Sequence, residues 1–357
     1  MKIKVTEKYR PFSHEVGTPL LLPESAWKVA PFPARLVLEH LITKEKIELF
    51  PQIKGPITAF TAMQDLEKKR VRIFGTGEGG FFSYRLYATP QEIILQIERC
   101  SEDGLSFNIC GEIKTFTRKE TFSLHSNAPF QLSHTSEKMH LGTSKKQDWT
   151  LVKRRLLLSE LLPILFELGK NLPNLPSTFS GAAEHLKTCQ ELVANKDRVH
   201  IGPSFIELFK RGFEGILCPR LIDTDYQGIA NPEEMPENAS PLFLIKEGAC
   251  LIRSLLIEEK DNSLTILPCL PKELHAGRFV NIACTLPLTL DLEWSKKQIR
   301  RLALHPKEDL TLHLIFPKEN VTYRLRAGPR GRGETRPATG PLTLKKGKLY
   351  LLDRFQK

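Results

Sequence analysis

The first third of the chain alternates apolar and polar residues with a period of two. Three such runs lie at 82–86, 93–97 and 105–109, and turn-forming residues separate them at 89–90 and 102–104. A period of two places one set of side chains on each face of a strand. Short strands at this spacing, divided by turns, predict an antiparallel β-sandwich.

The period changes to that of a helix in the middle of the chain. Apolar residues recur there three and four positions apart, with Ser159 as a predicted N-cap and Gly169 as a stop. The pattern predicts four helices, at 159–169, 181–194, 203–211 and about 241–258. Their apolar faces are broad, so each helix is expected to pack against other elements.

From residue 262 onward the period returns to two. Apolar residues alternate at 264–266, 288–294 and 310–316, and a last apolar run lies at 349–352. Between the last two runs, 326–336 is rich in glycine and arginine and has no hydrophobic anchor, which predicts a loop between two strands. The order of elements is therefore β, then α, then β.

These changes of period divide the chain into three parts and a connector. The fold class predicted is a multidomain β–α–β chain, with a β-sandwich at each end and a short helical region between them. The predicted parts are an N-terminal β-sandwich-like domain at 1–125, a polar connector at 126–148, a helical region of about four to six helices at 149–260 and a C-terminal β domain at 261–357.

Composition places the chain among folded proteins. Of its 357 residues, 41% are hydrophobic and 26% are charged. No apolar stretch approaches the ~18 residues that a membrane span needs, so no membrane partner is expected. The net charge is +11, and from Arg324 to Lys357 ten Lys or Arg residues stand against Glu334 and Asp353. Most of the excess positive charge is therefore C-terminal, where the basic loop 326–336 could meet an acidic partner.

The cysteines and histidines show no ligand spacing. Seven cysteines are scattered along the chain without a Cys-x-x-Cys pair, which argues against a disulfide framework and a zinc knuckle. The ten histidines form no His-x-x-x-His or His-Glu-x-x-His motif. We therefore expect no metal or other cofactor, and a reducing, cytoplasmic location.

Segments near both ends of the chain carry recognisable motifs. Residues 82–98 contain an aromatic strand, a Thr-Pro turn and an Ile-rich strand, and Leu264-Thr-Ile-Leu-Pro-Cys-Leu-Pro-Lys272 precedes Leu290-Asp-Leu-Glu-Trp294. In this order they resemble the N-terminal supersandwich, the barrel exit (Leu-Leu-Pro-Ala-Leu-Pro) and a C-terminal strand (Val-Asp-x-Glu-Trp) of the inverting α-L-fucosidase family of glycoside hydrolases. The resemblance implies a carbohydrate-associated protein with helices between two β-sandwiches.

The helical region departs from the pattern of that family. Its twelve-helix (α/α)6 barrel needs about 200 residues, whereas the segment 150–260 is long enough for only about six helices. The family's catalytic Asp stands in an Ile-Asp-Gly-Asn-Phe-Gly motif, and the corresponding stretch here, Pro241-Leu-Phe-Leu-Ile-Lys-Glu-Gly-Ala249, has no Asp. The barrel is therefore expected to be shortened and degenerate, and the family's catalytic residues do not transfer to this chain.

Candidate catalytic carboxylates come instead from the local pattern. Inverting glycosidases need two carboxyl groups about 6.5–9.5 Å apart, one as acid and one as base. The densest cluster is Glu214, Asp223 and Asp225, in a segment whose Gly and Pro residues predict a loop. If the chain is an enzyme, Asp223 or Asp225 is the predicted base and Glu214 or Glu247 the predicted acid.

The residues around this cluster have two interpretations. Tyr226 is the predicted sugar-stacking residue, and Arg220 is the second predicted substrate-binding residue. Arg220 is also placed to pair with Asp223 in a structural turn. Glu247 stands beside Lys246 in a segment with a helical pattern, which favours a solvated helix charge over a catalytic role.

Two other motifs are interpreted as structural. Asp291 and Glu293 alternate with apolar neighbours, so both are predicted on the solvent-facing side of a strand. The glycine-rich stretch 75–80 lacks the Lys-Ser/Thr of a phosphate-binding loop and precedes a strand, which predicts a hairpin turn.

Two classes of function remain open. The first is a carbohydrate-associated protein, either a minimal inverting glycosidase or a non-catalytic glycan-binding relative, with Trp27, Trp149, Phe213 and Tyr226 as candidate sugar platforms. The alternative is an interaction scaffold that uses the basic loop 326–336 for an acidic partner. Nucleic-acid binding through this loop is disfavoured because no aromatic residues are interleaved with its arginines.

Overall fold

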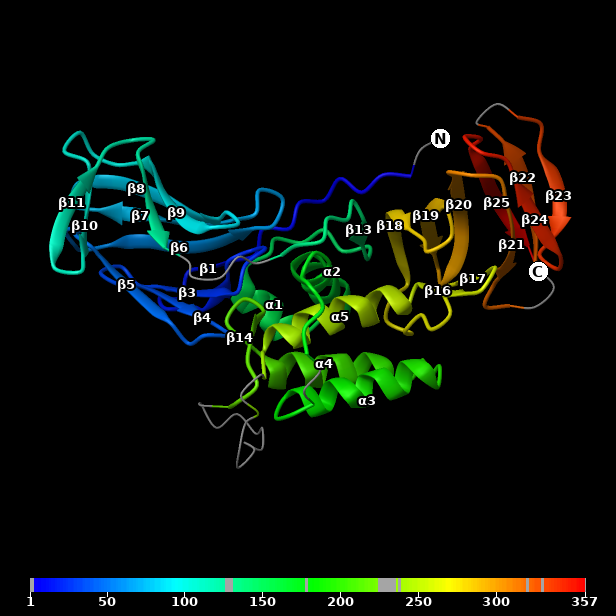
Figure 1. Cartoon of the computed structure of the whole chain (residues 1–357), viewed down its shortest axis with the longest axis horizontal. Helices are drawn as coiled ribbons and strands as arrows, with labels where there is room; N and C mark the ends of the chain where they lie inside the picture. The colour runs from blue at the N-terminus through cyan, green and yellow to red at the C-terminus, as the bar shows by residue number, and fades with distance from the viewer. Residues whose placement is uncertain are drawn as a thin grey trace.

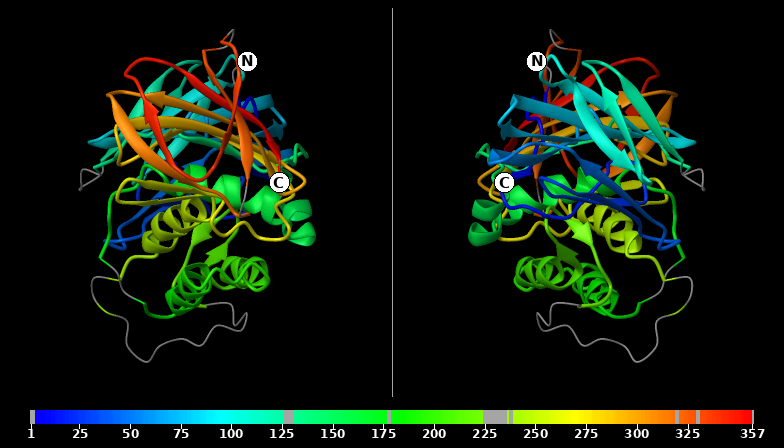
Figure 2. Two further views of the ribbon diagram at one scale, coloured as in Figure 1. Left: turned by 90° about the vertical axis from the view of Figure 1, so that its right-hand side faces the viewer. Right: turned by 90° about the vertical axis from the view of Figure 1, so that its left-hand side faces the viewer.

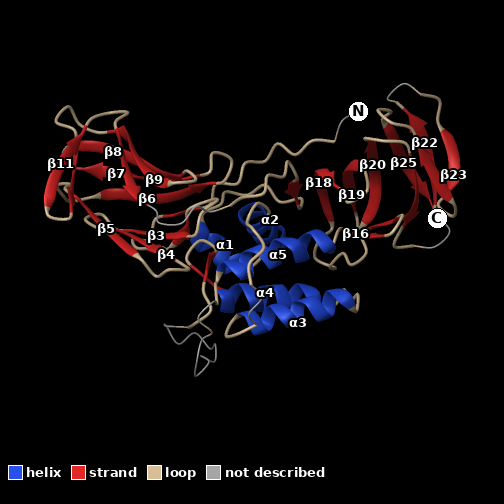
Figure 3. Ribbon diagram, viewed as in Figure 1, coloured by secondary structure: helices blue, strands red, loops and turns tan. Residues whose placement is uncertain are grey.

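The computed structural model is mostly β, with helices in the middle of the chain. It describes residues 3–125, 131–176, 179–223, 236, 239–318, 321–328 and 331–356. An N-terminal β body and a C-terminal β body lie at opposite ends of the long axis (Figures 1 and 3). The views along that axis place the helices on one side of both bodies (Figure 2). Within the described residues, every helix is too short or too polar to cross a membrane.

The N-terminal β body consists of two antiparallel sheets of six strands each. In spatial order, the first sheet contains β1 (Phe12–Ser13), β6 (Thr58–Asp65), β7 (Arg70–Gly77), β8 (Gly80–Ala88), β9 (Glu92–Arg99) and β12 (Thr121–His125). The second contains β11 (Glu112–Phe116), β10 (Leu105–Ile109), β5 (Lys46–Pro51), β4 (Leu36–His40), β3 (Trp27–Pro31) and β2 (Leu20–Leu21).

Aromatic side chains join the inner faces of these two sheets. Tyr84 of β8 and Phe107 of β10 are fully buried and meet edge to face, with ring centroids 5.4 Å apart. The apolar runs at 82–86, 93–97 and 105–109 lie in β8, β9 and β10, as their period predicts. The hairpin predicted at 75–80 is also confirmed, because β7 pairs with β8 up to Gly77 and Gly80.

The helical region contains five helices in the part of the chain that the structure describes. They are α1 (Trp149–Arg155), α2 (Leu158–Gly169), α3 (Ala183–Ala194), α4 (Ile201–Gly212) and α5 (Leu242–Ser254), with a short hairpin of β14 (Phe213–Glu214) and β15 (Cys218–Pro219) after α4. The helices α2 and α5 cross at close range. A Cβ atom added to Gly169 would lie 2.2 Å from the carbonyl oxygen of Ile245.

Two details of the predicted helices are wrong. The helix predicted to run to residue 258 ends at Ser254, because 257–260 form β16, which pairs with the next strand across a turn. The predicted N-cap Ser159 lies inside α2, which begins at Leu158, and its hydroxyl bonds Thr143 (2.6 Å) instead of capping the helix.

The C-terminal β body also contains two sheets. A seven-stranded sheet has the order β13 (Lys138–His140), β18 (Ala276–Ala283), β19 (Leu288–Ser295), β20 (Gln298–Pro306), β25 (Tyr350–Gln356), β22 (Thr322–Ala327) and β23 (Glu334–Pro337). A four-stranded sheet has the order β16 (Ile257–Lys260), β17 (Ser263–Ile266), β21 (Leu310–Ile315) and β24 (Pro341–Leu344). The β17–β21 pair is parallel.

The segment predicted as a plain connector supplies an edge strand to the C-terminal body. The strand β13 lies within 126–148 and pairs antiparallel with β18, with Met139 opposite Phe279. The Tyr9 hydroxyl donates to the carbonyl of Met139 (2.7 Å), and Arg278 donates to the carbonyl of Lys4 (3.5 Å). The N-terminal segment therefore extends from one β body to the other, as Figure 1 shows.

The prediction for Asp291 is wrong. Its side chain is buried, and the backbone N–H of Asn281 donates to it (2.8 Å) at a β-bulge in β18. The bulge turns Asn281 to a φ of +57°, so its N–H leaves the ladder and needs another acceptor. The neighbouring Glu293 is half-buried and bridges Arg278 and Arg301.

Arg253 joins the helices to the C-terminal β body. From the end of α5, it donates to Glu137 (3.2 Å), to Glu259 of β16 (3.2 Å) and to the carbonyl of Ala283 (2.7 Å). Burial alone would lower the pKa of Arg253, but Glu137 and Glu259 outweigh that effect and raise it. Each carboxylate also accepts one backbone N–H, from Ala283 (3.0 Å) and Thr285 (2.6 Å) respectively.

His40 is a buried histidine at the end of β4. Its Nδ1 accepts the backbone N–H of Thr43 (3.0 Å), and its ring packs edge to face on Trp27, with centroids 5.0 Å apart. Burial lowers the pKa of His40, which the charge of Glu45 offsets in part and that of Lys44 reinforces. Folding therefore favours the neutral form of this ring.

Replacing Arg253 by Met is expected to lower the free energy of unfolding by about 3 kcal/mol, because two largely buried carboxylates lose their counter-charge. Chemical denaturation at pH 7.5 measures the change. The control is Lys196→Met, which removes the more exposed Lys196–Glu258 pair (3.6 Å) and should cost less than about 0.5 kcal/mol. Adding Glu137→Gln to Arg253→Met should recover part of the lost stability. Equal losses in Arg253→Met and Lys196→Met would contradict the stabilising role of Arg253.

Acidification is expected to destabilise the protein through His40. Because folding lowers the pKa of this ring, the unfolded chain takes up the proton first as the pH falls below about 6.5, and stability is lost there. His40→Asn keeps an acceptor for Thr43 and should reduce the slope of unfolding free energy between pH 6.5 and 5 by up to about 1 kcal/mol per pH unit. His313→Asn, at an exposed position, should leave the slope unchanged; an unchanged slope in His40→Asn would refute the assignment.

Candidate functional site

A groove of about 390 Å³ lies where the helices meet the N-terminal β body. Its walls come from the segment before β2, from the end of α1, from the last turn of α4 and from the hairpin that follows α4. We call it the junction groove, and its lining residues are Pro19, Lys153, Leu156, Phe209, Lys210, Phe213, Glu214 and Gly215.

A tight turn after α4 positions the carboxylate of this groove. Gly215 has a φ of +46°, and a Cβ atom added to it would lie 2.0 Å from the carbonyl oxygen of Pro19. The backbone N–H of Ile216 donates to that same carbonyl (2.9 Å). The indole N–H of Trp149 donates to the carbonyl of Gly215. Only glycine fits this close approach, so the turn is held against β2 and Glu214 is fixed beside it.

Glu214 belongs to a small charge network with the N-terminal β body. The ammonium of Lys28 lies 3.4 Å from Glu214 and 3.0 Å from Glu39. Burial acts to lower the pKa of Lys28, but the surrounding negative groups, Glu214 first among them, outweigh it and raise the pKa. The predicted acid Glu214 is thus half of an ion pair that stabilises the junction.

Asp223 and Arg220 form a buried pair beside the last turn of α4. The exposed fraction of Asp223 is 1%, and its carboxylate lies 3.4 Å from the Arg220 guanidinium. The same guanidinium donates to the carbonyls of Arg211 (3.2 Å) and Lys210 (3.4 Å). Those carbonyls belong to the last turn of α4, where a cation is favourable. The geometry supports the structural interpretation of this pair.

Among the described residues, the predicted site residues Arg220, Asp223 and Glu247 do not line the junction groove with Glu214. Glu247 is half-buried on α5 and is not part of the groove lining. Asp225 and Tyr226 lie outside the described residues, so their predicted roles stay untested. Of the predicted cluster, Glu214 is thus the member that the described residues place in the junction groove.

The three predicted sugar platforms that the structure describes are largely buried. Trp27 and Trp149 are buried, with exposed fractions of 2% and 1%, and Phe213 is 6% exposed. Sequence reasoning missed Phe209, which is half-buried and nearly parallel to Phe213, with centroids 6.3 Å and planes 20° apart. It also missed Lys153 and Lys210. The one signal for Phe209 is its position four residues before Phe213, near the end of a helix.

The basic loop is shorter than predicted, and its Arg326 is already bound within the chain. Strands β22 and β23 take up both ends of 326–336, and residues 329–330 lie outside the described part. Arg324 holds Asp353 with two hydrogen bonds (2.8 and 2.9 Å), and Arg326 adds a third (2.6 Å). Hydrogen bonds from Arg324 are the largest cause of the lowered pKa of Asp353, and the charge of Arg326 lowers it further.

Comparison with known proteins does not assign the chain to a family. Neither the family models nor the curated proteins include a match to this sequence. Among the residues that the structure describes, no three His, Cys, Asp or Glu side chains are grouped so that they could hold a metal ion.

Gly215→Ala should lower the free energy of unfolding by about 2 kcal/mol or more, because the new methyl group meets the Pro19 carbonyl at a positive φ. Gly347→Ala is the matched control, since Gly347 has a φ of +70° and open space around its Cβ position. Gly347→Ala should cost about 1 kcal/mol, which is the strain of placing alanine at a positive φ without any steric contact. Equal losses in the two variants would show that the contact with Pro19 contributes nothing.

Proposed function

We propose that this chain is a carbohydrate-associated protein that binds a glycan in the junction groove without hydrolysing it. The proposal joins the resemblance to the inverting α-L-fucosidase-type hydrolases with a β–α–β order of elements. In this view, 1–125 and 261–357 are β-sandwich domains and 149–260 is what remains of the helical barrel.

The observation that carries the proposal is the composition of the junction groove. The half-buried ring of Phe209 lies beside Phe213, and Glu214, Lys153 and Lys210 surround them. Sugars present an apolar C–H face and a rim of hydroxyl groups, so a phenyl ring beside charged groups suits both parts. A volume of about 390 Å³ lies within the range of small-molecule sites.

Two features favour binding over hydrolysis. Glu214 is paired with Lys28, which ties its carboxylate to the junction. Asp223 is buried in its pair with Arg220 and is fixed at the end of α4. An inverting reaction needs one carboxylate to activate water and a second to protonate the leaving group, both facing the same sugar. Carboxylates already used in this way are poorly placed for either role.

The alternative scaffold function has weaker support. It relies on basic residues of 326–336 meeting an acidic partner. Arg326, however, is bound to Asp353, and Arg336 lies 3.0 Å from Glu334. Charges that are already paired within the chain attract an external acidic partner less strongly.

A glycan array probed with the purified chain, with nitrophenyl glycosides tested for turnover, examines the proposal. We expect binding without turnover. For the glycan with the strongest signal, calorimetry should show about tenfold weaker binding by Phe209→Ala, the loss of roughly one ring stacking contact. Phe50→Ala, which removes an exposed ring on β5, is the control and should bind normally.

Three outcomes would overturn parts of this proposal. Turnover that Glu214→Gln abolishes would make the chain a glycosidase. Unchanged binding by Phe209→Ala would place the glycan elsewhere. A silent array together with absent turnover would reject the carbohydrate function and favour the scaffold alternative.

A further inference from the structure

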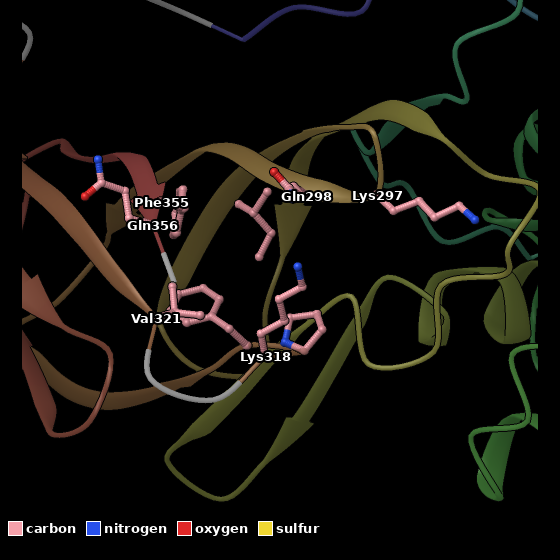
Figure 4. A pocket seen from close by; sticks show the side chains of 9 residues that line it. Lys297, Gln298, Lys318, Val321, Phe355 and Gln356 are labelled. Carbon is pink, nitrogen blue, oxygen red and sulfur yellow. The ribbon is translucent and has the colours of Figure 1, made fainter.

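A second cavity lies in the C-terminal β body, away from the junction groove. It has a volume of about 100 Å³ and lies where the ends of β20, β21, β22 and β25 meet (Figure 4). We call it the terminal pocket. Its lining residues are Lys297, Gln298, Ile299, Phe316, Pro317, Lys318, Val321, Phe355 and Gln356.

The apolar floor of the terminal pocket comes from both C-terminal sheets. β21 belongs to the four-stranded sheet, whereas β20, β22 and β25 belong to the seven-stranded sheet. Phe316 and Phe355 meet edge to face with centroids 5.5 Å apart, and Tyr323 packs against both rings. Both phenylalanines are only half-buried, so part of each ring lines the cavity.

One lysine is directed into this opening and another is not. In Figure 4, the Lys318 side chain enters the space bordered by Val321, Phe355 and Gln298. Lys297 lies on the rim, and its ammonium extends away from the cavity. A single ammonium above an apolar floor favours a ligand that carries a negative group next to an apolar one.

The volume limits the apolar part of such a ligand. A closed cavity of about 150 Å³ accepts one benzene molecule. The terminal pocket is smaller but opens to solvent, so it holds part of one phenyl ring or a branched aliphatic group, with the polar end outside. Larger fused rings and long acyl chains exceed this space.

We propose that the terminal pocket binds small carboxylates whose apolar part is a phenyl ring or a branched aliphatic group. The apolar part lies against Phe316, Phe355 and Val321, and the carboxylate pairs with Lys318. This site is separate from the junction groove and does not depend on the glycan function.

Phenylacetate and its uncharged analogue phenylacetamide test this proposal on the full chain. The two probes share the ring and nearly the same shape, so their difference reports the charge. Calorimetry and ligand-observed NMR should give a dissociation constant of about 1 mM for phenylacetate. Phenylacetamide should bind about tenfold more weakly, and added salt should narrow the difference.

Lys318→Met should remove the preference for phenylacetate while keeping weak binding of both probes. Lys297→Met is the matched control, because it removes a lysine of the same rim whose ammonium points away, and it should leave both constants within about twofold. Val321→Phe fills the pocket and should abolish binding of both probes. Thermal unfolding of each variant verifies that it remains folded.

Specific results would overturn the inference. Equal affinity for phenylacetate and phenylacetamide would show that Lys318 selects no anion. Equal effects of Lys318→Met and Lys297→Met would show that only the general charge of the rim matters. Absence of phenylacetate binding up to about 20 mM would show that the pocket takes no such ligand.

Discussion

The network of hydrogen bonds around Arg253 is the constraint on which the arrangement of the chain depends. One guanidinium binds Glu137 of the connector, Glu259 of β16 and the carbonyl of Ala283 in β18. The connector, β16 and β18 are thereby all fixed to the end of α5. Glu137 and Glu259 are largely buried, so moving Arg253 away would leave their charges unpaired in a poorly hydrated place.

The junction groove depends on an analogous contact on the other side of the helices. There the backbone is the constraint, because the turn at Gly215 rests on the carbonyl of Pro19 and is held by Trp149. Glu214 immediately precedes Gly215 and meets Lys28 of the N-terminal β body. The groove therefore has walls from two parts of the chain, and its shape is fixed by contacts that also hold those parts together. The Glu214 carboxylate both pairs with the N-terminal β body and lines the groove.

Much of the fold could be predicted from the sequence because local period reports local structure. Alternation over 82–86, 93–97 and 105–109 identified β8, β9 and β10, and the broad apolar faces identified four helices. α1 was missed because only Trp149 and Val152 of its seven residues are buried, too few for a visible stripe. β13 was missed because three residues carry no period, and it is a strand only through its pairing with β18.

The candidate site was less predictable because sequence proximity says little about the direction of side chains. Glu214 and Asp223 are nine positions apart, yet one faces the groove and the other is buried against Arg220. Asp291 follows the alternation of an outward residue but is buried, because a bulge in the neighbouring strand leaves a backbone N–H that needs an acceptor. Bulges and ion pairs are properties of the partner segment, which the local pattern does not contain.

The pairing of β13 with β18 has a consequence for the order in which the protein assembles during synthesis. Met139 leaves the ribosome long before its partner Phe279, so the edge strand of the C-terminal sheet is made first and must wait. Over that interval the N-terminal sheets and most of the helices can fold around it. The strand β18 then pairs with β13, which is already present. A segment made before the helices thereby sets the position at which the C-terminal β body assembles.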